Sequence, residues 1–336
     1  MTSITGVSAA DNLPDPESGK PLEGDRASTG GMGDLLFGGA AKAAGAIVVA
    51  LVILVGVFLL SQAVPSLMKN EANFLTSTDW VTSGEHPRFG IARLLWVTVA
   101  SSVIAMAVAV PIGVGVALFI TQYSPKWLAR PAAQLIDLLA AIPSIVYGIW
   151  GAYVAGPYFL PFQKWLGETL GWIPLFKPTN ISGSSTILFV GFVLSIMVLP
   201  IVTALTREVF DQTPNAHKEG ALALGATKWE MIRTAVLPFG KPGVISASML
   251  GLGRALGETL AVMIIVSALN DDAPWSWSLL NGGETFASKI ANNAGEFDTP
   301  QKTGAYIAAG LVLFVLTFVV NAIARIVIER RKAFTE

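Results

Sequence analysis

Six apolar segments, each about 20 to 27 residues long, constrain the fold of this chain more than any other feature. An α-helix rises about 1.5 Å per residue, so about 20 apolar residues cross the hydrocarbon core of a bilayer. Because that core offers no water to the backbone, each crossing must satisfy its own hydrogen bonds, as a helix does. The segments cover about residues 43–64, 94–120, 135–154, 186–205, 243–267 and 304–327. We therefore expect an all-α polytopic membrane protein with six transmembrane helices in one domain, residues 43–330.

Composition supports a membrane protein and excludes several classes of site. Hydrophobic residues make up 53% of the 336 residues and charged residues 13%, which is about half the usual share of charge. The net charge of -1 gives no indication of nucleic-acid binding. There is no cysteine, and the two histidines lie far apart in the sequence. We therefore expect no metal site and no catalytic residue in this chain.

The polar segments predict the orientation of the chain. Residues 1–42 are polar, rich in Gly, Ser, Pro and Asp, and without an apolar period, which predicts a disordered tail. With both termini inside, the inner segments carry 14 Lys and Arg residues and the outer loops carry 7. Cytoplasmic connections carry an excess of Lys and Arg, so this balance places the tail and both termini in the cytoplasm.

The connection at 206–242 is long and carries signals for two helices. Thr213 and Pro214 predict the start of a short helix, with Thr213 as the cap and Pro214 at the first helical position. Gly225 predicts its end, because glycine readily adopts the left-handed conformation that follows a helix.

A second helix is predicted to follow directly. Thr227 and Glu230 have the T-x-x-E spacing of a capping box, and the helix they start is expected to end near Pro238. The result is a helix–glycine–helix elbow. Physical reasoning leaves two roles open for it, a re-entrant packing element or a knob for a cytoplasmic partner.

The elbow resembles a family motif. The segment EGALALGATKWEMIRTAVLP, residues 219–238, resembles the EAA loop of bacterial ABC-importer permeases, whose pattern is E-A-A, three residues, G, nine residues, then I-x-L-P. Gly220 and Ala235 replace an alanine and the isoleucine of that pattern. The resemblance implies a coupling helix that sits in a groove of a separate ATPase. It implies these coupling residues: Glu219, Gly220, Ala221, Leu222, Gly225 and Thr227.

Arg254 and Glu258 are the charges near the middle of an apolar segment. Placing each of these charges at the bilayer centre costs about 2.5–3.5 kcal/mol, which indicates a functional role. Four residues apart on one helix, they would share a face and partly neutralise each other. Either the pair holds the bundle together, or it lines the path of a polar solute. The N–H donors of a guanidinium suit phosphate or carboxylate oxygens, so we predict that Arg254 contacts an anion and that Glu258 orients Arg254.

The surrounding sequence points to a particular branch of importers. The segment GLGRALGETLAV, around Arg254, resembles the fifth span of phosphate-importer permeases, where R-A-[LI]-G-E-T accompanies the EAA loop. The segment LAAIPSIVYGIWGAYV, residues 139–154, looks like the PstC-type subunit rather than its PstA-type partner. The resemblance covers roughly residues 43–330 and implies the type I ABC-importer permease (MetI-like) fold. The expected pathway residues are Arg254, Glu258, Thr259, Gly251 and Asn321.

The resemblance also implies an assembly in the bacterial plasma membrane. This chain would form half of a phosphate pathway, with a PstA-type permease, a PstB-type ATPase dimer and a PstS-type extracytoplasmic phosphate-binding protein as partners. It has no G-x-x-x-x-G-K-[ST] loop, so ATP and Mg are expected on the partner ATPase and no cofactor on this chain.

Alternatives remain at this point. Another oxyanion, such as molybdate or sulfate, could be the solute, and an intramembrane enzyme could also carry a buried Arg and Glu. Asn321 could form a helix–helix hydrogen bond, and Gly253 with Gly257 has the G-x-x-x-G spacing of helix packing. Ser144 and Tyr147, which follow Pro143, could line the path or accept freed backbone bonds. The outer-loop tryptophans fit membrane-interface anchors or a docking surface: Trp165, Trp172, Trp275 and Trp277.

Overall fold

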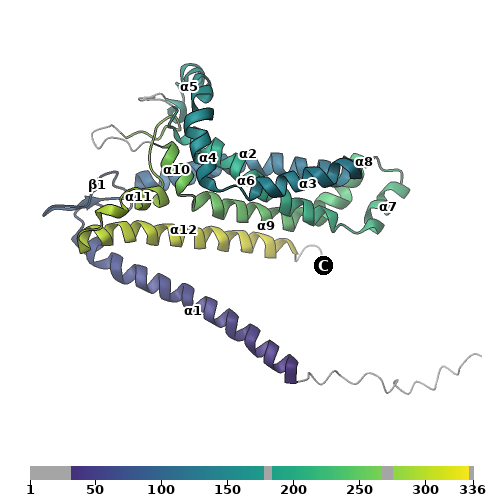
Figure 1. Cartoon of the computed structure of the whole chain (residues 1–336), viewed down its shortest axis with the longest axis horizontal. Helices are drawn as coiled ribbons and strands as arrows, with labels where there is room; N and C mark the ends of the chain where they lie inside the picture. Colours follow the sequence, from purple (N-terminus) through teal and green to yellow (C-terminus); the bar gives the residue numbers. More distant parts are fainter. Residues whose placement is uncertain (1–31, 178–183, 267–274, 333–336) are drawn as a thin grey trace, which may run out of the picture. The chain divides into compact units, whose positions relative to one another are not determined.

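The computed structural model describes residues 32–177, 184–266 and 275–332, and most of them are helical (Figure 1). Internal contacts distinguish two compact units, Met1–Val55 and Gly56–Glu336. The described part of the first unit is the beginning of the N-terminal helix, and its side chains are almost all exposed. Every residue that the sequence places in a site belongs to the second unit.

The elements are helices of very different lengths with one small hairpin. The α-helices are α1 (Met32–Lys69), α2 (Ala92–Leu118), α3 (Lys126–Ala140), α4 (Ser144–Trp150), α5 (Gly156–Leu170), α6 (Ile187–Asp211), α7 (Asn215–Ala223), α8 (Lys228–Met231), α9 (Leu237–Leu256), α10 (Leu260–Ile265), α11 (Phe286–Asn292) and α12 (Pro300–Lys332). There are π-helical turns at η1 (Phe119–Tyr123), η2 (Gly151–Ala155) and η4 (Ile232–Val236), and 3-10 turns at η3 (Pro174–Phe176) and η5 (Ala294–Glu296). The strands β1 (Trp80–Val81) and β2 (Arg88–Phe89) pair antiparallel.

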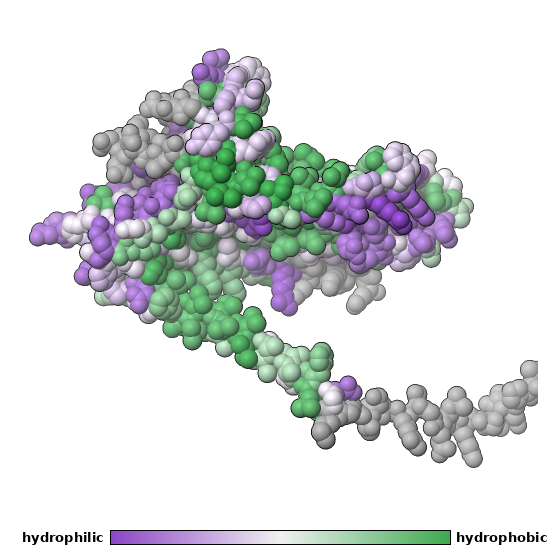
Figure 2. All heavy atoms as spheres, in the orientation of Figure 1, coloured by the Kyte–Doolittle hydropathy of each residue, from purple (hydrophilic) through white to green (hydrophobic). Residues whose placement is uncertain are grey.

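The predicted all-α membrane fold is confirmed. Five described helices are long and apolar enough to cross a membrane, and a sixth crossing results if α3 and the segment Ser144–Leu170 count as one bent span. Hydrophobic side chains cover the middle of the second unit, and hydrophilic ones gather at its two ends (Figure 2). This distribution suits a bundle whose middle lies in lipid.

The N-terminal helix begins earlier than the sequence predicts. It starts at Met32, so residues 32–42, assigned above to the polar tail, are helical. Leucine and alanine in this stretch have high helix propensity, and Asp34 in the first turn complements the helix dipole. The rest of the predicted tail, residues 1–31, lies outside the described residues.

The predicted third segment, residues 135–154, is not one straight span. The helix α3 ends at Ala140, and the helical segment Ser144–Leu170 leaves it at 87°. Pro143 lies in the corner, where its ring disfavours a helical conformation for Ile142 and it offers no N–H to the turn. A proline inside an apolar run therefore breaks the element here, although neighbouring helices can tolerate one elsewhere.

The sequence predicts that the helix after the elbow ends near Pro238, and this prediction is wrong. From Lys228 to Leu256 the chain is helical without interruption, and η4 joins α8 to α9. In η4 the Leu237 N–H donates to the Ile232 carbonyl, five residues back. This wider π turn accommodates the ring of the following proline, which would otherwise press on the preceding turn.

The helix α6 forms the centre of the second unit, where it packs against both α2 and α9. Its inward side chains, among them Phe189, Val193 and Met197, are almost fully buried. At Gly191 an added Cβ would lie 2.6 Å from the Ile104 Cβ, so glycine allows α2 and α6 to approach closely. This packed frame holds the hairpin end and the elbow end of the unit apart (Figure 1).

Candidate functional site

The helix α9 does not continue through both of the charged residues in the fifth apolar segment. It ends at Leu256, and residues 257–259 form a break before α10 begins. The Glu258 Oε1 accepts a hydrogen bond from the Ala261 N–H at 3.2 Å, so this carboxylate caps the first turn of α10. The prediction that Arg254 and Glu258 share one face of a continuous helix is wrong, because α9 ends at Leu256 and Glu258 lies in the break before α10.

The two charged side chains differ in burial and in partners. Glu258 is 8% exposed, whereas Arg254 is an exposed residue. No ion pair joins them in the part of the chain that the structure describes. Arg254 lies in the last turn of α9, where the helix dipole favours a cation. Within the described ranges it is therefore a cation that no carboxylate neutralises directly.

A second helix break lies beside the first. The short helix α4, which follows the α3–α4 corner, packs against α10, and an added Cβ at Gly148 would lie 2.9 Å from the Ala261 Cα. The Tyr147 hydroxyl donates to the Leu139 carbonyl at 3.0 Å, which ties the start of α4 to the end of α3. For Tyr147 the alternative of satisfying the backbone is therefore confirmed.

One face of α9 is covered and the opposite face is not. Ala247, Gly251 and Ala255 are buried, whereas Leu250 and Arg254 are exposed. At Gly251 an added Cβ would lie 2.7 Å from a Val198 methyl of α6. The structure thus places Gly251 in the packing between α9 and α6 rather than beside Arg254.

The remaining predicted pathway residues occupy different places. Thr259 belongs to the break, where its hydroxyl donates to the Gly257 carbonyl at 3.2 Å. Asn321 is exposed on α12, a helix that packs against α9. Gly253 has no atom within 4 Å of an added Cβ, so the predicted G-x-x-x-G packing is absent among the residues that the structure describes. The break therefore gathers Arg254, Glu258 and Thr259.

The elbow at the opposite end of α9 is built largely as predicted. The chain turns at Gly225 with φ +85°, the left-handed conformation expected there. The Thr227 N–H donates to Glu230 Oε2 at 2.8 Å and the Glu230 N–H donates to Thr227 Oγ1 at 3.3 Å, which confirms the capping box. The predicted Thr213 cap is wrong, because Pro214 occupies the cap position and the buried Thr213 hydroxyl has no partner among the described residues.

The predicted coupling residues lie on two sides of α7. Ala221 packs against an inner cluster that includes Met231 and Ile232. Glu219, Gly220 and Leu222 are exposed, as is Ala223. Two further exposed residues nearby, Leu224 and Trp229, are not predicted as part of this side from the sequence. Leu224 is 91% exposed, so an apolar side chain stands in the open beside the turn. In a helix, residues three or four positions apart share a face, so helical periodicity could have indicated which side of α7 is exposed.

Comparison with protein families gives a match over most of the chain. A family described as "Binding-protein-dependent transport system inner membrane component" matches residues 109–333. The phosphate transport system permease protein PstC 2 of Mycobacterium tuberculosis is 54% identical over 296 residues, which cover 87% of this chain and 91% of that protein. The phosphate transport system permease protein PstC of Xylella fastidiosa is 40% identical over 275 residues, with 79% and 81% covered.

A solved structure shows the same fold. An inward-facing crystal form of the MetNI methionine ABC transporter matches with a TM-score of 0.53 over 72% of this chain and 95% of that chain. The sequences are 15% identical, so the likeness concerns the fold alone. It agrees with the predicted MetI-like arrangement of helices.

Proposed function

This chain belongs to the family of inner-membrane components of binding-protein-dependent transport systems, and we propose that the break between α9 and α10 is where it contacts its solute. It is a permease subunit of a phosphate importer and a multi-pass protein of the plasma membrane. It is a transport subunit and not an enzyme. The solute at the break is therefore inorganic phosphate.

The observation that carries this proposal is the uncompensated charge of Arg254. A guanidinium in lipid is costly, and this one lacks a carboxylate partner within the described residues. Its fork of N–H donors fits two oxygens of a phosphate. Broken helices in transporters place unsatisfied backbone groups and charges beside the solute, and Arg254 stands at such a break. We assign direct contact with phosphate to Arg254.

Glu258 has a different role, as a positioning residue. Its carboxylate is buried and accepts the Ala261 N–H, so it holds the start of α10 in place. A buried anion close to the break also keeps the empty site from binding phosphate too tightly. Thr259 shares the break and is a second polar group that phosphate can reach. This division replaces a direct Arg254–Glu258 ion pair as the function of the two charges.

The open face of α9 indicates how the pathway is completed. Leu250 and Arg254 lie on the side of α9 that no described part of this chain covers. Phosphate must be enclosed while it crosses, so a second permease subunit of the PstA type covers this face. Each subunit then contributes one half of the pathway, and Asn321 on the neighbouring α12 lies at its edge.

The elbow couples this chain to an ATPase. We propose that the exposed side of α7 sits in a groove of a PstB-type ATPase dimer, which binds the ATP and Mg. The elbow then lies in the cytoplasm with both termini, in agreement with the excess of Lys and Arg on that side. A PstS-type extracytoplasmic protein delivers phosphate to the opposite end of the unit.

Phosphate uptake by Arg254 variants tests the proposal. Arg254→Ala and Arg254→Lys are compared with wild type in the full complex, by uptake of radiolabelled phosphate into proteoliposomes. Arg254→Ala should reduce uptake by about ten- to a hundredfold, the range expected for losing a charge-assisted contact, while all subunits still co-purify. Arg254→Lys should keep a small residue of activity, because it retains the charge but not the fork. Normal uptake by Arg254→Ala would refute direct contact.

A further inference from the structure

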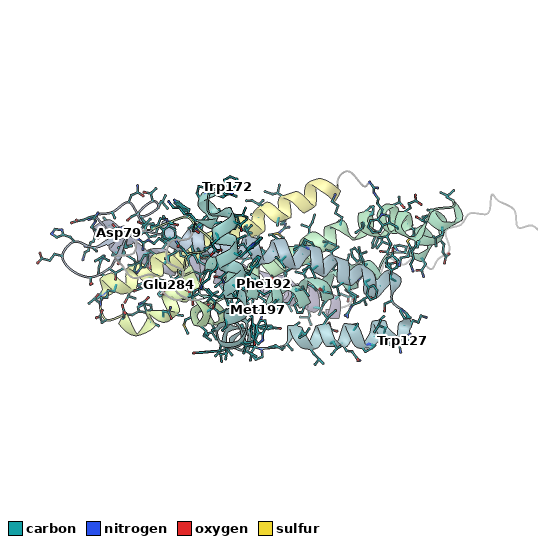
Figure 3. All side chains as sticks on the ribbon, turned by 90° about the horizontal axis from the view of Figure 1, so that it is seen from above. Asp79, Trp127, Trp172, Phe192, Met197 and Glu284 are labelled. Atoms are coloured by element: carbon teal, nitrogen blue, oxygen red, sulfur yellow. The ribbon has the colours of Figure 1, made fainter. Side chains whose placement is uncertain are left out.

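A pocket lies at the hairpin end of the second unit, at the opposite end from the elbow. It has a volume of about 180 Å³, enough for a small hydrated anion. Its wall comes from the hairpin, the start of α2 and the segment that leads into α11; its charged and aromatic residues include Asp79, Trp80, Arg88, Arg93, Trp275, Glu284 and Lys289. Asp79 and Glu284 lie near each other at one end of the unit and Trp127 lies at the other (Figure 3). The helix α2, with 27 residues, extends about 40 Å from this end towards the elbow.

Two of the three cations in the wall already have partners. The Lys289 Nζ lies 2.8 Å from a Glu284 oxygen, and both side chains are largely buried. Arg88 lies 3.7 Å from Asp79 in a more exposed pair. These pairs neutralise both carboxylates of the wall, so the two pairs together add no net charge to the pocket. The third cation, Arg93, leaves the pocket with one excess positive charge.

Arg93 is fixed in place without an anion. Its guanidinium carbon lies 5.3 Å from the centroid of the Trp275 ring, a cation–π contact that holds the plane of the guanidinium. It forms no ion pair with any described residue, and its buried Nε has no hydrogen-bond acceptor there. A planar cation that is positioned in advance loses less entropy when it binds oxygens.

The same wall has a surplus of hydrogen-bond donors. The indole N–H groups of Trp80 and Trp275 are buried and, like the Arg93 Nε, have no acceptor among the described residues. Buried donors without a partner are rare in folded proteins, and three lie in the wall of one pocket. The first turn of α2 contains no acidic residue, so its dipole adds to the positive potential. The charge of Arg93, which is unpaired among the described residues, and the dipole of α2 both favour a negatively charged ligand in this pocket.

We propose that this pocket is a second oxyanion site, which holds free phosphate on the outer side of the membrane before it moves inward to Arg254. Arg93 contacts the anion, and Trp275 positions Arg93. The identity of the anion rests on the proposed function, since phosphate is what the importer carries. The pocket wall contains no residue of the break at residues 257–259, so the two sites can be changed independently.

Equilibrium binding of radiolabelled inorganic phosphate tests the site. The complex of both permeases and the ATPase, without the binding protein, is placed in nanodiscs. Arg93→Gln should bind one phosphate fewer per complex than wild type, or bind it at least about tenfold more weakly. Arg254→Ala should remove a different phosphate, so the double variant should lose both. Wild-type binding by Arg93→Gln would overturn the pocket proposal, whereas wild-type binding by Arg254→Ala would overturn only the proposed role of the break.

A matched control separates a site from general electrostatics. Lys302 lies at the start of α12, which packs against the hairpin through Tyr306 and Trp80. It is outside the pocket wall and pairs with Asp298 at 3.2 Å. Lys302→Gln removes the same charge as Arg93→Gln and should leave phosphate binding unchanged. Equal weakening by the two variants would mean that the surface charge, and not the pocket, attracts phosphate, and would overturn the proposal.

Two further outcomes would mean that a protein segment, and not free phosphate, occupies the pocket. Capture of the phosphate-binding protein by the complex should be the same for Arg93→Gln and wild type, and a loss of capture would mean that the pocket docks that protein. Asp271 and Asp272 lie outside the described residues, and their change to Asn should leave phosphate affinity unaltered. Tighter phosphate binding by that variant would mean that the chain fills the pocket with its own carboxylate.

Discussion

Replacing Gly251 by alanine tests whether this residue packs helices or lines the pathway. An added Cβ would lie 2.7 Å from the Val198 Cγ1 and 2.9 Å from the Val202 Cγ2, where ordinary contacts are about 3.4–4 Å. Val198 and Val202 are both buried and β-branched, so neither side chain can rotate away freely. The helices α9 and α6 must then separate locally. Overpacking of this kind typically costs about 1–3 kcal/mol of folding free energy.

Gly253 supplies a matched control on the same helix. An added Cβ there meets no described atom within 4 Å, so Gly253→Ala should leave stability unchanged or raise it by about 0.5–1 kcal/mol through helix propensity. The free energy of unfolding of the isolated chain, from SDS titration in mixed micelles, should therefore separate the two variants by more than about 1 kcal/mol. Equal stabilities would refute the packing argument. Loss of phosphate uptake by Gly251→Ala with full stability would instead place Gly251 in the pathway.

Three other variants test separate parts of the account. Glu258→Gln keeps an acceptor for the Ala261 N–H and should retain assembly and part of the uptake, whereas Glu258→Ala should lower stability by about 0.5–2 kcal/mol and abolish uptake; identical behaviour of the two would exclude the capping role. Gly225→Val forces a β-branched residue to φ +85° and should reduce co-purification of the ATPase, while Gly225→Asn should be tolerated; intact coupling in the valine variant would argue against the elbow as coupling element. Tyr147→Phe removes the hydroxyl bound to the Leu139 carbonyl and should cost about 0.5–1.5 kcal/mol in the same SDS titration, and an unchanged value would mean that this bond does not hold the α3–α4 corner.

The features that the sequence predicted well are local ones. Long apolar runs indicate crossings because lipid leaves the backbone no alternative to a helix. The capping box of Thr227 with Glu230 and the turn at Gly225 were predictable because each depends on residues within a few positions of one another. The family motifs added the fold and the solute, which the spacing of residues alone could not provide.

The two helix breaks were not predicted, and the reason is physical. Proline and glycine occur in intact membrane helices as well as in broken ones, since neighbouring helices can satisfy the freed backbone groups. Pro143 was recognised inside an apolar segment, yet only tertiary packing decides that the chain turns there by 87°. Once α9 ends before Glu258, a spacing of four residues no longer implies one face, and the predicted side-by-side pair disappears.

The pocket at the hairpin end could not be predicted from sequence patterns. Arg93 and Trp275 are separated by 182 positions in the chain and meet only because α2 and the segment before α11 fold to the same end. From the sequence, the tryptophans of the predicted outer loops fit membrane anchors or a docking surface. For Trp275 the contact with Arg93 adds a third role, which is to position Arg93 for an anion.

The distance between Arg254 and bound phosphate tests the central claim most directly. Solid-state NMR of the complex, with 15N-labelled arginine in this chain, measures dipolar coupling between guanidinium nitrogens and the 31P nucleus; an Arg93→Gln background leaves the break as the site under study. We expect a coupling that corresponds to about 4 Å, as a charge-assisted N–H···O contact to phosphate requires, and we expect Arg254→Lys to abolish it. A coupling that persists in Arg254→Lys, or no coupling while phosphate remains bound, would contradict direct contact between Arg254 and phosphate.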